Sequence, residues 1–324
     1  MKSPRTIDLF CGAGGSSWGA RDAGAEIVAG FDMWTTSGLV YSDNFPESKF
    51  FHGKLEDRDA GEIARELGGI DLILASPECT NHSPAKGNKP RCDISRDTAF
   101  QVIKFAKALS PRWIVIENVA SMKMWSRFEL FIKQLEDLGY KMNIQVLNSA
   151  DFGVPQNRKR LFIICDKKQK PGNIQAPDVV IKPARTIINS NGDYLYTPLK
   201  TPRRARATLE RANRAILSLG NDVPFLIVYY GTDHSGGWQS LDNPLRTVTT
   251  LDRFAFVRPN CKGYEMRMLQ PDELKAAMSM PLDFKIEHGS RRDKIKMIGN
   301  AVCPKVMERV IKSLVSRVSM GTSS

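Results

Sequence analysis

The chain has 324 residues, a formal net charge of +12, and 42% hydrophobic against 25% charged residues. These proportions are ordinary for a soluble globular protein with one large domain or two unequal ones. They argue against a membrane role, because no apolar run approaches the roughly 20 residues that cross a bilayer. The first ten residues also lack a signal-peptide pattern, so we expect a cytoplasmic protein with no membrane partner.

The cysteines and the positive charge each narrow the function further. The six cysteines form no C-x-x-C pair, so we expect reduced thiols and no metal site. Residues 166–214 contain 11 Lys or Arg against four Asp or Glu, a net charge of +7. This is more than half of the net charge of the whole chain, which is +12. A surplus this localised favours a polyanion-binding surface over a solubility charge spread evenly.

Strand-like and helix-like segments alternate in the first half of the chain. The strand-like runs are residues 6–10, 27–31, 70–75, 113–117, 145–147 and 161–164, and the helix-like stretches are 15–23, 99–109 and 129–138. Such alternation indicates a parallel sheet covered by helices on both faces. Sheets of this kind bind ligands where their strands end.

The alternation stops after Cys165, which predicts a second, smaller domain. We place the first domain at residues 1–165, completed by 290–320 with a last helix at 302–318, and the smaller one at 166–289. Within the smaller domain, β-like pieces are expected at 225–230 and 245–250. An apolar stripe predicts a helix over 205–219, and five arginines lie off the stripe: Arg203, Arg204, Arg206, Arg211 and Arg214. A solvated surface helix and a phosphate-binding helix both fit.

The segment Asp8-Leu9-Phe10-Cys11-Gly12-Ala13-Gly14-Gly15 combines a strand end, a glycine turn and a helix start. Glycines at this position let the backbone approach a nucleotide-like ligand, and Asp32, after the second strand, is placed to bind ribose hydroxyls. A tight turn without a ligand is the alternative. The absence of G-x-G-x-x-G favours an adenosyl cofactor without a pyrophosphate.

Cys79 is a candidate nucleophile, because Ser76-Pro77-Glu78-Cys79-Thr80 follows the apolar run 72–75 as a tight turn. The loop at 80–91 is rich in small, polar and basic residues and is predicted to be a mobile lid. Nearby arginines can lower the pKa of a thiol and so supply the reactive thiolate. An inert buried thiol is the alternative.

Two further segments carry charged residues at strand ends. Glu117 ends an apolar strand, where a carboxylate is costly unless it has a partner, so either a salt bridge or a general acid is expected. Gln156-x-Arg158-x-Arg160 precedes another apolar run. If this stretch is a strand, alternation puts both guanidinium groups on one side, where they could hold a carbonyl oxygen or a phosphate.

Together these segments resemble the cytosine-C5 DNA methyltransferases over nearly the whole chain. The motifs in order are Asp8 to Gly19, Ser76-Pro77-Glu78-Cys79, Glu117-Asn118-Val119, Gln156-x-Arg158-x-Arg160, Pro244 to Thr249, and Gly299-Asn300-Ala301-Val302. Each motif is weak alone, but six in family order make a strong signal. The resemblance implies an α/β, Rossmann-like class I methyltransferase with a mostly parallel, doubly wound sheet and a smaller target-recognition domain.

The resemblance also implies a reaction and its site residues. A methyl group would pass from S-adenosylmethionine to C5 of a cytosine flipped out of a specific duplex DNA sequence. Cys79 would bond C6, Glu117 would protonate or hydrogen-bond N3, Arg158 would hold O2, and Arg160 would support the loop. On the cofactor side, Phe10 and Met33 would sandwich the adenine and Asp32 would bind the ribose. The other implied cofactor contacts are Gly12, Gly14, Leu55, Pro77 and Asn300.

Candidate DNA contacts come from the lid and from the smaller domain. They are Ser83, Lys86, Arg203, Arg204, Arg206, Tyr230 and Trp238. For the two aromatic residues, core or loop packing is an equal alternative. The sequence departs from the family pattern at Glu78, beside the nucleophile, and at Lys54, where the family usually carries Asp.

Double-stranded DNA is the expected partner, and a cognate restriction endonuclease would be a functional partner only. We expect a monomer from a bacterium or a phage. A transfer-RNA methyltransferase on the same scaffold is the second hypothesis, disfavoured by the basic segment after residue 165. A catalytically silent DNA-binding subunit is the third, and the presence of Cys79, Glu117, Arg158 and Arg160 argues against it. A nucleotide-dependent oxidoreductase fits least, because it would not need these motifs together.

Overall fold

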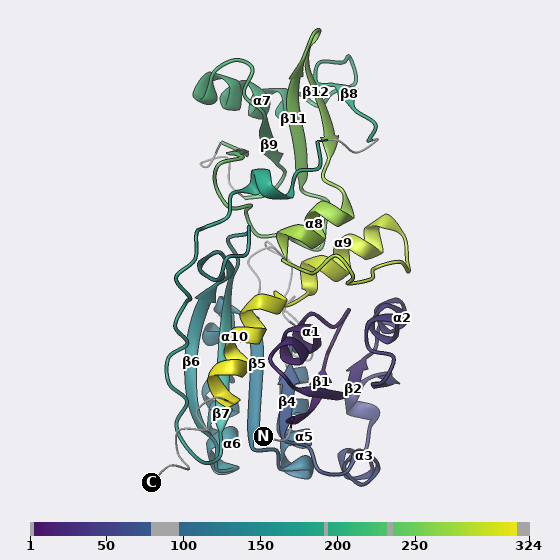
Figure 1. Ribbon diagram of the computed structural model, residues 1–324, viewed down its shortest axis with the longest axis vertical. Coiled ribbons are helices and arrows are strands. Elements are labelled where there is room, and N and C mark those ends of the chain that lie inside the picture. Colours follow the sequence, from purple (N-terminus) through teal and green to yellow (C-terminus); the bar gives the residue numbers. More distant parts are fainter. Residues whose placement is uncertain (1–2, 79–96, 191–193, 232–235, 316–324) are drawn as a thin grey trace.

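The computed structural model describes residues 3–78, 97–190, 194–231 and 236–315. Two parts follow one another along the long axis of the molecule (Figure 1). A seven-stranded sheet forms the lower part and a five-stranded sheet forms the upper part. Within the described ranges, no helix has the length and apolar character needed to span a membrane.

The lower sheet has the strand order β3-β2-β1-β4-β5-β7-β6. Its strands are β1 (Arg5–Leu9), β2 (Glu26–Asp32), β3 (Lys49–His52), β4 (Leu72–Ala75), β5 (Trp113–Val119), β6 (Lys141–Asn148) and β7 (Lys159–Asp166). All neighbours pair in parallel except β7, which is antiparallel to both β5 and β6. The α/β fold with a mostly parallel sheet is therefore confirmed. The short edge strand β3 was not predicted.

Helices cover both faces of the lower sheet, as expected for a doubly wound fold. They are α1 (Gly15–Asp22), α2 (Thr35–Asn44), α3 (Ala60–Leu67), α5 (Phe100–Leu109), α6 (Phe128–Asp137) and α10 (Pro304–Val315). Along β4, Leu72 and Leu74 face one core with Trp18, whereas Ile73 faces the other with Phe105. Successive strand residues point to opposite faces, so one apolar strand serves two cores.

The C-terminal helix α10 returns to the lower part, as the sequence predicted. It packs closely on α1, because a Cβ atom at Gly19 would lie 2.3 Å from the carbonyl oxygen of Pro304. The last residues of the predicted helix, 316–318, lie outside the described residues. Two elements of the lower part, α2 and α3, were not predicted. In α2 the reason is composition, since Thr, Ser and Gly are weak helix formers.

The upper sheet is antiparallel, with the order β10-β9-β11-β12-β8. Its strands are β8 (Thr197–Pro198), β9 (Phe225–Val228), β10 (Trp238–Ser240), β11 (Phe254–Asn260) and β12 (Gly263–Met268). Helix α7 (Arg206–Leu219) packs on this sheet through Ala212 and Ala215, so the predicted helix and its apolar stripe are confirmed. Helices α8 (Pro271–Ala277) and α9 (Arg291–Asn300) lie between the two sheets (Figure 1).

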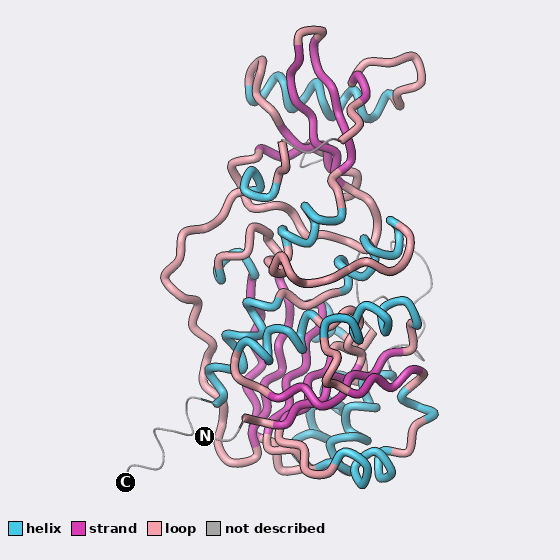
Figure 2. Tube along the Cα trace, turned by 45° about the vertical axis from the view of Figure 1, so that its right-hand side comes forward, coloured by secondary structure: helices cyan, strands magenta, loops and turns pink. Residues whose placement is uncertain are grey.

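Two expectations about the chain after residue 165 were wrong. Residues 245–250 form no strand, and only an isolated bridge joins Leu245 to Gln156. Residues 168–175 were assigned to the smaller domain, yet they run in extended form beside β6 of the lower part (Figures 1 and 2). Side chains of β6 hold them there, since the Gln145 amide both donates to and accepts from the backbone of Ile174. This segment covers the outer edge of the sheet, where backbone groups of β6 lack a strand partner.

Candidate active site

The glycine turn after β1 surrounds an open space beside Asp32. The backbone N–H of Gly12 donates to Oδ2 of Asp32 at 2.9 Å, and the N–H of Trp34 donates to Oδ1 at 2.8 Å. Gly12 has a φ of +53°, and a Cβ atom there would meet nothing within 4 Å. Burial raises the pKa of Asp32, although the N–H groups oppose this. The carboxyl group of Asp32 is thus fixed beside the open space at Gly12.

Phe10 and Met33 lie at the same edge of the sheet, because they follow the neighbouring strands β1 and β2. Phe10 is half-buried, and Met33 keeps 62% of its surface exposed. Asn300 is exposed at the end of α9. It is brought near the glycine turn because a Cβ atom at Gly15 would lie 2.4 Å from the carbonyl oxygen of Val302.

Three predicted cofactor contacts have packing roles that the sequence did not indicate. Gly14 has a φ of +93°, and a Cβ atom there would lie 2.4 Å from the ring of Phe45, so close helix packing already requires the glycine. Leu55 belongs to the same core of the lower part as Ile73 and Phe105. Pro77 is buried, and its carbonyl oxygen accepts from Nδ2 of Asn118 at 3.0 Å.

The turn that leads to Cys79 is held between two other motifs. The N–H of Ser76 donates to the carbonyl of Leu9, and the hydroxyl groups of Ser76 and Ser16 are 3.5 Å apart. On the other side, the bond from Asn118 to Pro77 ties the turn to β5. Glu78 is exposed. Cys79 itself lies outside the described residues, as do the predicted DNA contacts Ser83 and Lys86.

Glu117 is a buried carboxyl group close to an arginine. Its surface is 5% exposed, and Nε of Arg160 lies 3.2 Å from Oε1. Among the described residues, no donor makes a well-aligned hydrogen bond to this oxygen. Burial raises the pKa of Glu117, while the charges of Arg160 and Arg158 act in the opposite direction. A carboxyl with a raised pKa and an unsatisfied oxygen is suited to share a proton with a ligand.

Arg158 does not converge with Arg160 on one open point, contrary to the sequence-based prediction. Its side chain is 2% exposed, and its two terminal nitrogens donate to the carbonyl oxygens of Val248 (3.1 Å), Gly299 (2.9 Å) and Ala301 (3.0 Å). The alternation argument failed because β7 begins only at Lys159. Gln156 is likewise buried, and it accepts from the N–H of Val248.

The predicted DNA contacts of the upper part differ in their surroundings. Arg203 is exposed, and Arg204 donates to two backbone carbonyls and a hydroxyl of the segment just before it. Arg206 pairs with a glutamate one turn along α7. Tyr230 donates its hydroxyl to a backbone carbonyl at 2.8 Å, and Trp238 packs against the upper core. Both aromatic residues therefore have partners within the protein.

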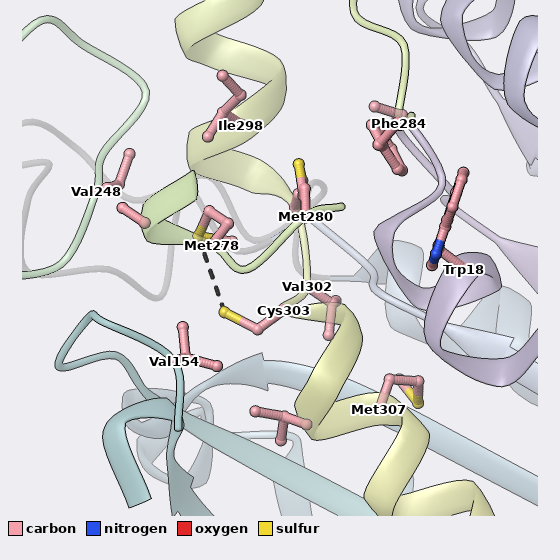
Figure 3. Packing of buried hydrophobic residues seen from close by; sticks show 14 of the residues in the cluster. Trp18, Val154, Val248, Met278, Met280, Phe284, Ile298, Val302, Cys303 and Met307 are labelled. Atoms are coloured by element: carbon pink, nitrogen blue, oxygen red, sulfur yellow. Dashed lines mark hydrogen bonds between the residues drawn. The ribbon is translucent and has the colours of Figure 1, made fainter. Parts of the chain in front are cut away.

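The described cysteines offer no competing nucleophile in the core. Cys303 packs among apolar side chains, 3.8 Å from the sulfur of Met278 (Figure 3), and burial raises its pKa. Burial also raises the pKa of Cys11 and of Cys165. Cys261 is exposed in the turn between β11 and β12. Across the described ranges, no group of three or more metal-ligating side chains comes together.

Asp8 is a notable residue of this edge to which the sequence gave no role beyond its motif. It is fully buried, and its Oδ2 accepts from the hydroxyl of Ser17 at 2.7 Å, which in turn lies 3.2 Å from the hydroxyl of Tyr41. Its Oδ1 has no donor among the described residues. Burial raises the pKa of Asp8 to about 7. A carboxylate between the two apolar residues Ile7 and Leu9 was the available signal.

Comparison with known proteins gives matches over nearly the whole chain. The model of the C-5 cytosine-specific DNA methylase family matches residues 4–316. The Type II methyltransferase M.HindV of Haemophilus influenzae is 27% identical over 330 residues, covering 96% of each chain. M.DdeI of Desulfomicrobium norvegicum is 32% identical over 202 residues, which is 60% of this chain but only 46% of that protein.

Two further groups of similar proteins are relevant to the substrate. A human tRNA (cytosine(38)-C(5))-methyltransferase is 27% identical over 185 residues, covering 56% of this chain and 47% of that protein. Among solved structures, a methyltransferase of Entamoeba histolytica has a TM-score of 0.73 at 18% identity, covering 98% of this chain and 99% of that one. DNMT2 of Spodoptera frugiperda, as a mutant, has a TM-score of 0.70 at 18% identity, covering 97% and 100%. At this identity the structural likeness shows the fold alone.

Proposed function

Because the chain belongs to the C-5 cytosine-specific DNA methylase family, we propose that it methylates C5 of a cytosine in double-stranded DNA, using S-adenosylmethionine. The observation that carries the proposal is the buried carboxyl of Glu117, which keeps one oxygen without a hydrogen-bond donor among the described residues. Glu117 lies at the strand ends that also carry the glycine turn at Gly12 and the turn leading to Cys79.

The residues around Gly12 fit an adenosyl cofactor. The space beside Gly12 is open, since a Cβ atom there would meet nothing within 4 Å, and Asp32 presents a fixed carboxyl that can accept from ribose hydroxyls. Phe10 and Met33 offer apolar surface for the adenine, and Asn300, near the glycine turn, is assigned to the methionine part. When bound, S-adenosylmethionine supplies an electrophilic methyl group.

The protein side of the reaction is assigned to Cys79, Glu117 and Arg160. The thiolate of Cys79 adds to C6 of the cytosine, and the electrons of the C5–C6 double bond become available at C5 for the methyl group. Glu117 donates a hydrogen bond or a proton to N3, and burial raises its pKa in the direction that favours the protonated form. Loss of the C5 proton then restores the double bond and releases the thiolate.

Arg160, rather than Arg158, is assigned to the base oxygen O2. Its guanidinium lies beside Glu117 and is 16% exposed, whereas that of Arg158 is bound to three backbone carbonyls. A guanidinium already bonded to carbonyl oxygens cannot reach a base without giving up those bonds, each worth about 1.5–3 kcal/mol for a charged donor. The roles expected for the two arginines are therefore exchanged.

Duplex DNA is the proposed substrate, because the chain carries a basic segment and a five-stranded upper part after the catalytic motifs. A target base inside a duplex must be flipped out to reach Glu117. Transfer RNA is the second candidate, supported by the similarity to the human tRNA methyltransferase. The Type II names of other relatives support a functional pairing with a separate restriction endonuclease. We propose a monomer.

Bisulfite sequencing of plasmid DNA from cells that express the protein tests this function. Methylated cytosines in one fixed sequence context are expected, and a Cys79→Ala variant should abolish them. A folded wild-type protein that leaves DNA unmethylated, yet labels transfer RNA with tritiated cofactor, would replace the first candidate with the second. Failure on both substrates would reject the proposal.

A further inference from the structure

Arg158 joins segments that are far apart in the sequence. Its three carbonyl partners belong to Val248, in the segment that leads towards β11, and to Gly299 and Ala301, on either side of Asn300. The carbonyl of Gly299 is among those that the C-terminus of α9 leaves without helical partners, and it carries partial negative charge. The buried guanidinium is thus stabilised by carbonyl dipoles at a helix end.

The same junction is tightly packed on its other side. A Cβ atom at Gly299 would lie 2.3 Å from the carbonyl oxygen of Thr249, so the two backbones are in direct contact. The neighbouring N–H of Val248 donates to the side chain of Gln156 at 2.8 Å. Val248 and Ile298, which neighbour these residues in the chain, belong to the buried apolar cluster drawn in Figure 3. Residues 248–249 are therefore held between Gln156 and the end of α9.

Building on the proposed function, we propose that Arg158 is a positioning residue that fixes the turn at Asn300 and residues 248–249 in one arrangement without touching the base. Its planar guanidinium can serve three carbonyls at once, which a lysine ammonium on a flexible stem cannot reproduce. Loosening this junction should disorder the cofactor side of the site even when DNA is absent. A residue that only held the base would affect DNA-dependent steps alone.

The test is the affinity of the full chain for S-adenosylhomocysteine without DNA, measured by titration calorimetry on the wild type and on Arg158→Lys. We expect the variant to bind about tenfold more weakly, because preorganisation of the site is lost. Arg112→Lys is the matched control. This half-buried arginine pairs with Asp166 beside the start of β5, at the other end of the strands from the site. The affinity of Arg112→Lys for S-adenosylhomocysteine should not change. Unchanged affinity in Arg158→Lys, with methyl transfer lost, would overturn the inference in favour of base contact.

A second variant reaches the junction from the other side. Gly299→Ala would push a methyl group against the carbonyl of Thr249 while leaving Arg158 in place, and should weaken binding in the same way. If the two positions act through one arrangement, the double variant should lose less than the two single losses combined. Full additivity would contradict the shared arrangement, and Gly299→Ala carries the test if thermal unfolding shows that Arg158→Lys does not fold. A wild type that fails to bind S-adenosylhomocysteine or to methylate would instead reject the proposed function.

Discussion

The two sheets treat their buried charges differently. At the strand ends of the lower part, Asp8 and Glu117 each keep an oxygen without a hydrogen-bond donor among the described residues. In the upper part, Arg267 of β12 and Glu273 of α8 are both 2% exposed, and two bonds of 2.7 Å join them. The N–H groups of Asn189 and Gln270 also donate to this glutamate. Asp8 and Glu117 are thus incompletely hydrogen-bonded, whereas the buried pair of Arg267 and Glu273 is held by several hydrogen bonds.

The largest effect on activity is expected at Glu117. Glu117→Gln removes the transferable proton but keeps the shape, so we expect kcat to fall by about 10²–10⁴-fold. The fold should be unaffected, because the amide avoids the cost of burying a carboxylate. Methylation of a plasmid with tritiated cofactor measures the rate, and thermal unfolding is the control. A kcat within tenfold of the wild type would show that Glu117 belongs to the scaffold.

The upper pair should show the opposite behaviour. Arg267→Met leaves Glu273 buried without its cation, and we expect the upper part to lose about 3–5 kcal/mol of stability. Urea denaturation of the full chain measures this loss. The double variant Arg267→Met with Glu273→Leu should recover much of it, since both charges are then removed. A loss below about 1 kcal/mol, the range of exposed ion pairs, would contradict the scaffold role.

The buried Asp8 should make the stability of the protein depend on pH. Burial raises its pKa to about 7, above the usual 3.8, so the folded protein holds a proton that the unfolded chain has released. This contribution to stability is fully present below about pH 4 and is lost as the pH rises through about 7. As the pH rises over this range, the free energy of unfolding of Asp8→Asn should therefore increase relative to that of the wild type, by up to about 4 kcal/mol. Parallel curves for the two proteins from pH 4 to 8 would contradict the raised pKa.

The smallest expected difference is between two neighbouring arginines before α7. Arg203 is exposed, and Arg203→Ala should lower the slope of log affinity against log salt by about one if the arginine contacts a phosphate. Arg204 donates to the carbonyls of Pro198 and Leu199, so Arg204→Ala should cost about 1 kcal/mol of stability with the slope unchanged. Filter binding across a salt series and urea denaturation distinguish the two. Equal slopes for Arg203→Ala and the wild type would remove this arginine from the interface.

The sequence predicted most of the lower part because its strands carry a strong local signal. Runs such as Leu72–Ala75 are apolar throughout, as strands buried on both faces must be. The edge strand β3 and helix α2 lack this signal, and they form because neighbouring strands and rings cover them. Residues 245–250 are an opposite case. Their apolar residues suggested a strand, but the N–H and carbonyl groups of Val248 bond to side chains of Gln156 and Arg158 instead.

The sequence by itself determined the family, the order of the motifs, and the placing of Glu117 and Asp32 at strand ends, because these follow from residue type and local spacing. Only the tertiary structure decided which arginine lies beside Glu117 and which one binds the chain itself. Arg158 and Arg160 are two residues apart and chemically identical. Their roles differ because the end of α9, more than 130 residues further along the chain, places its carbonyl groups around one of them.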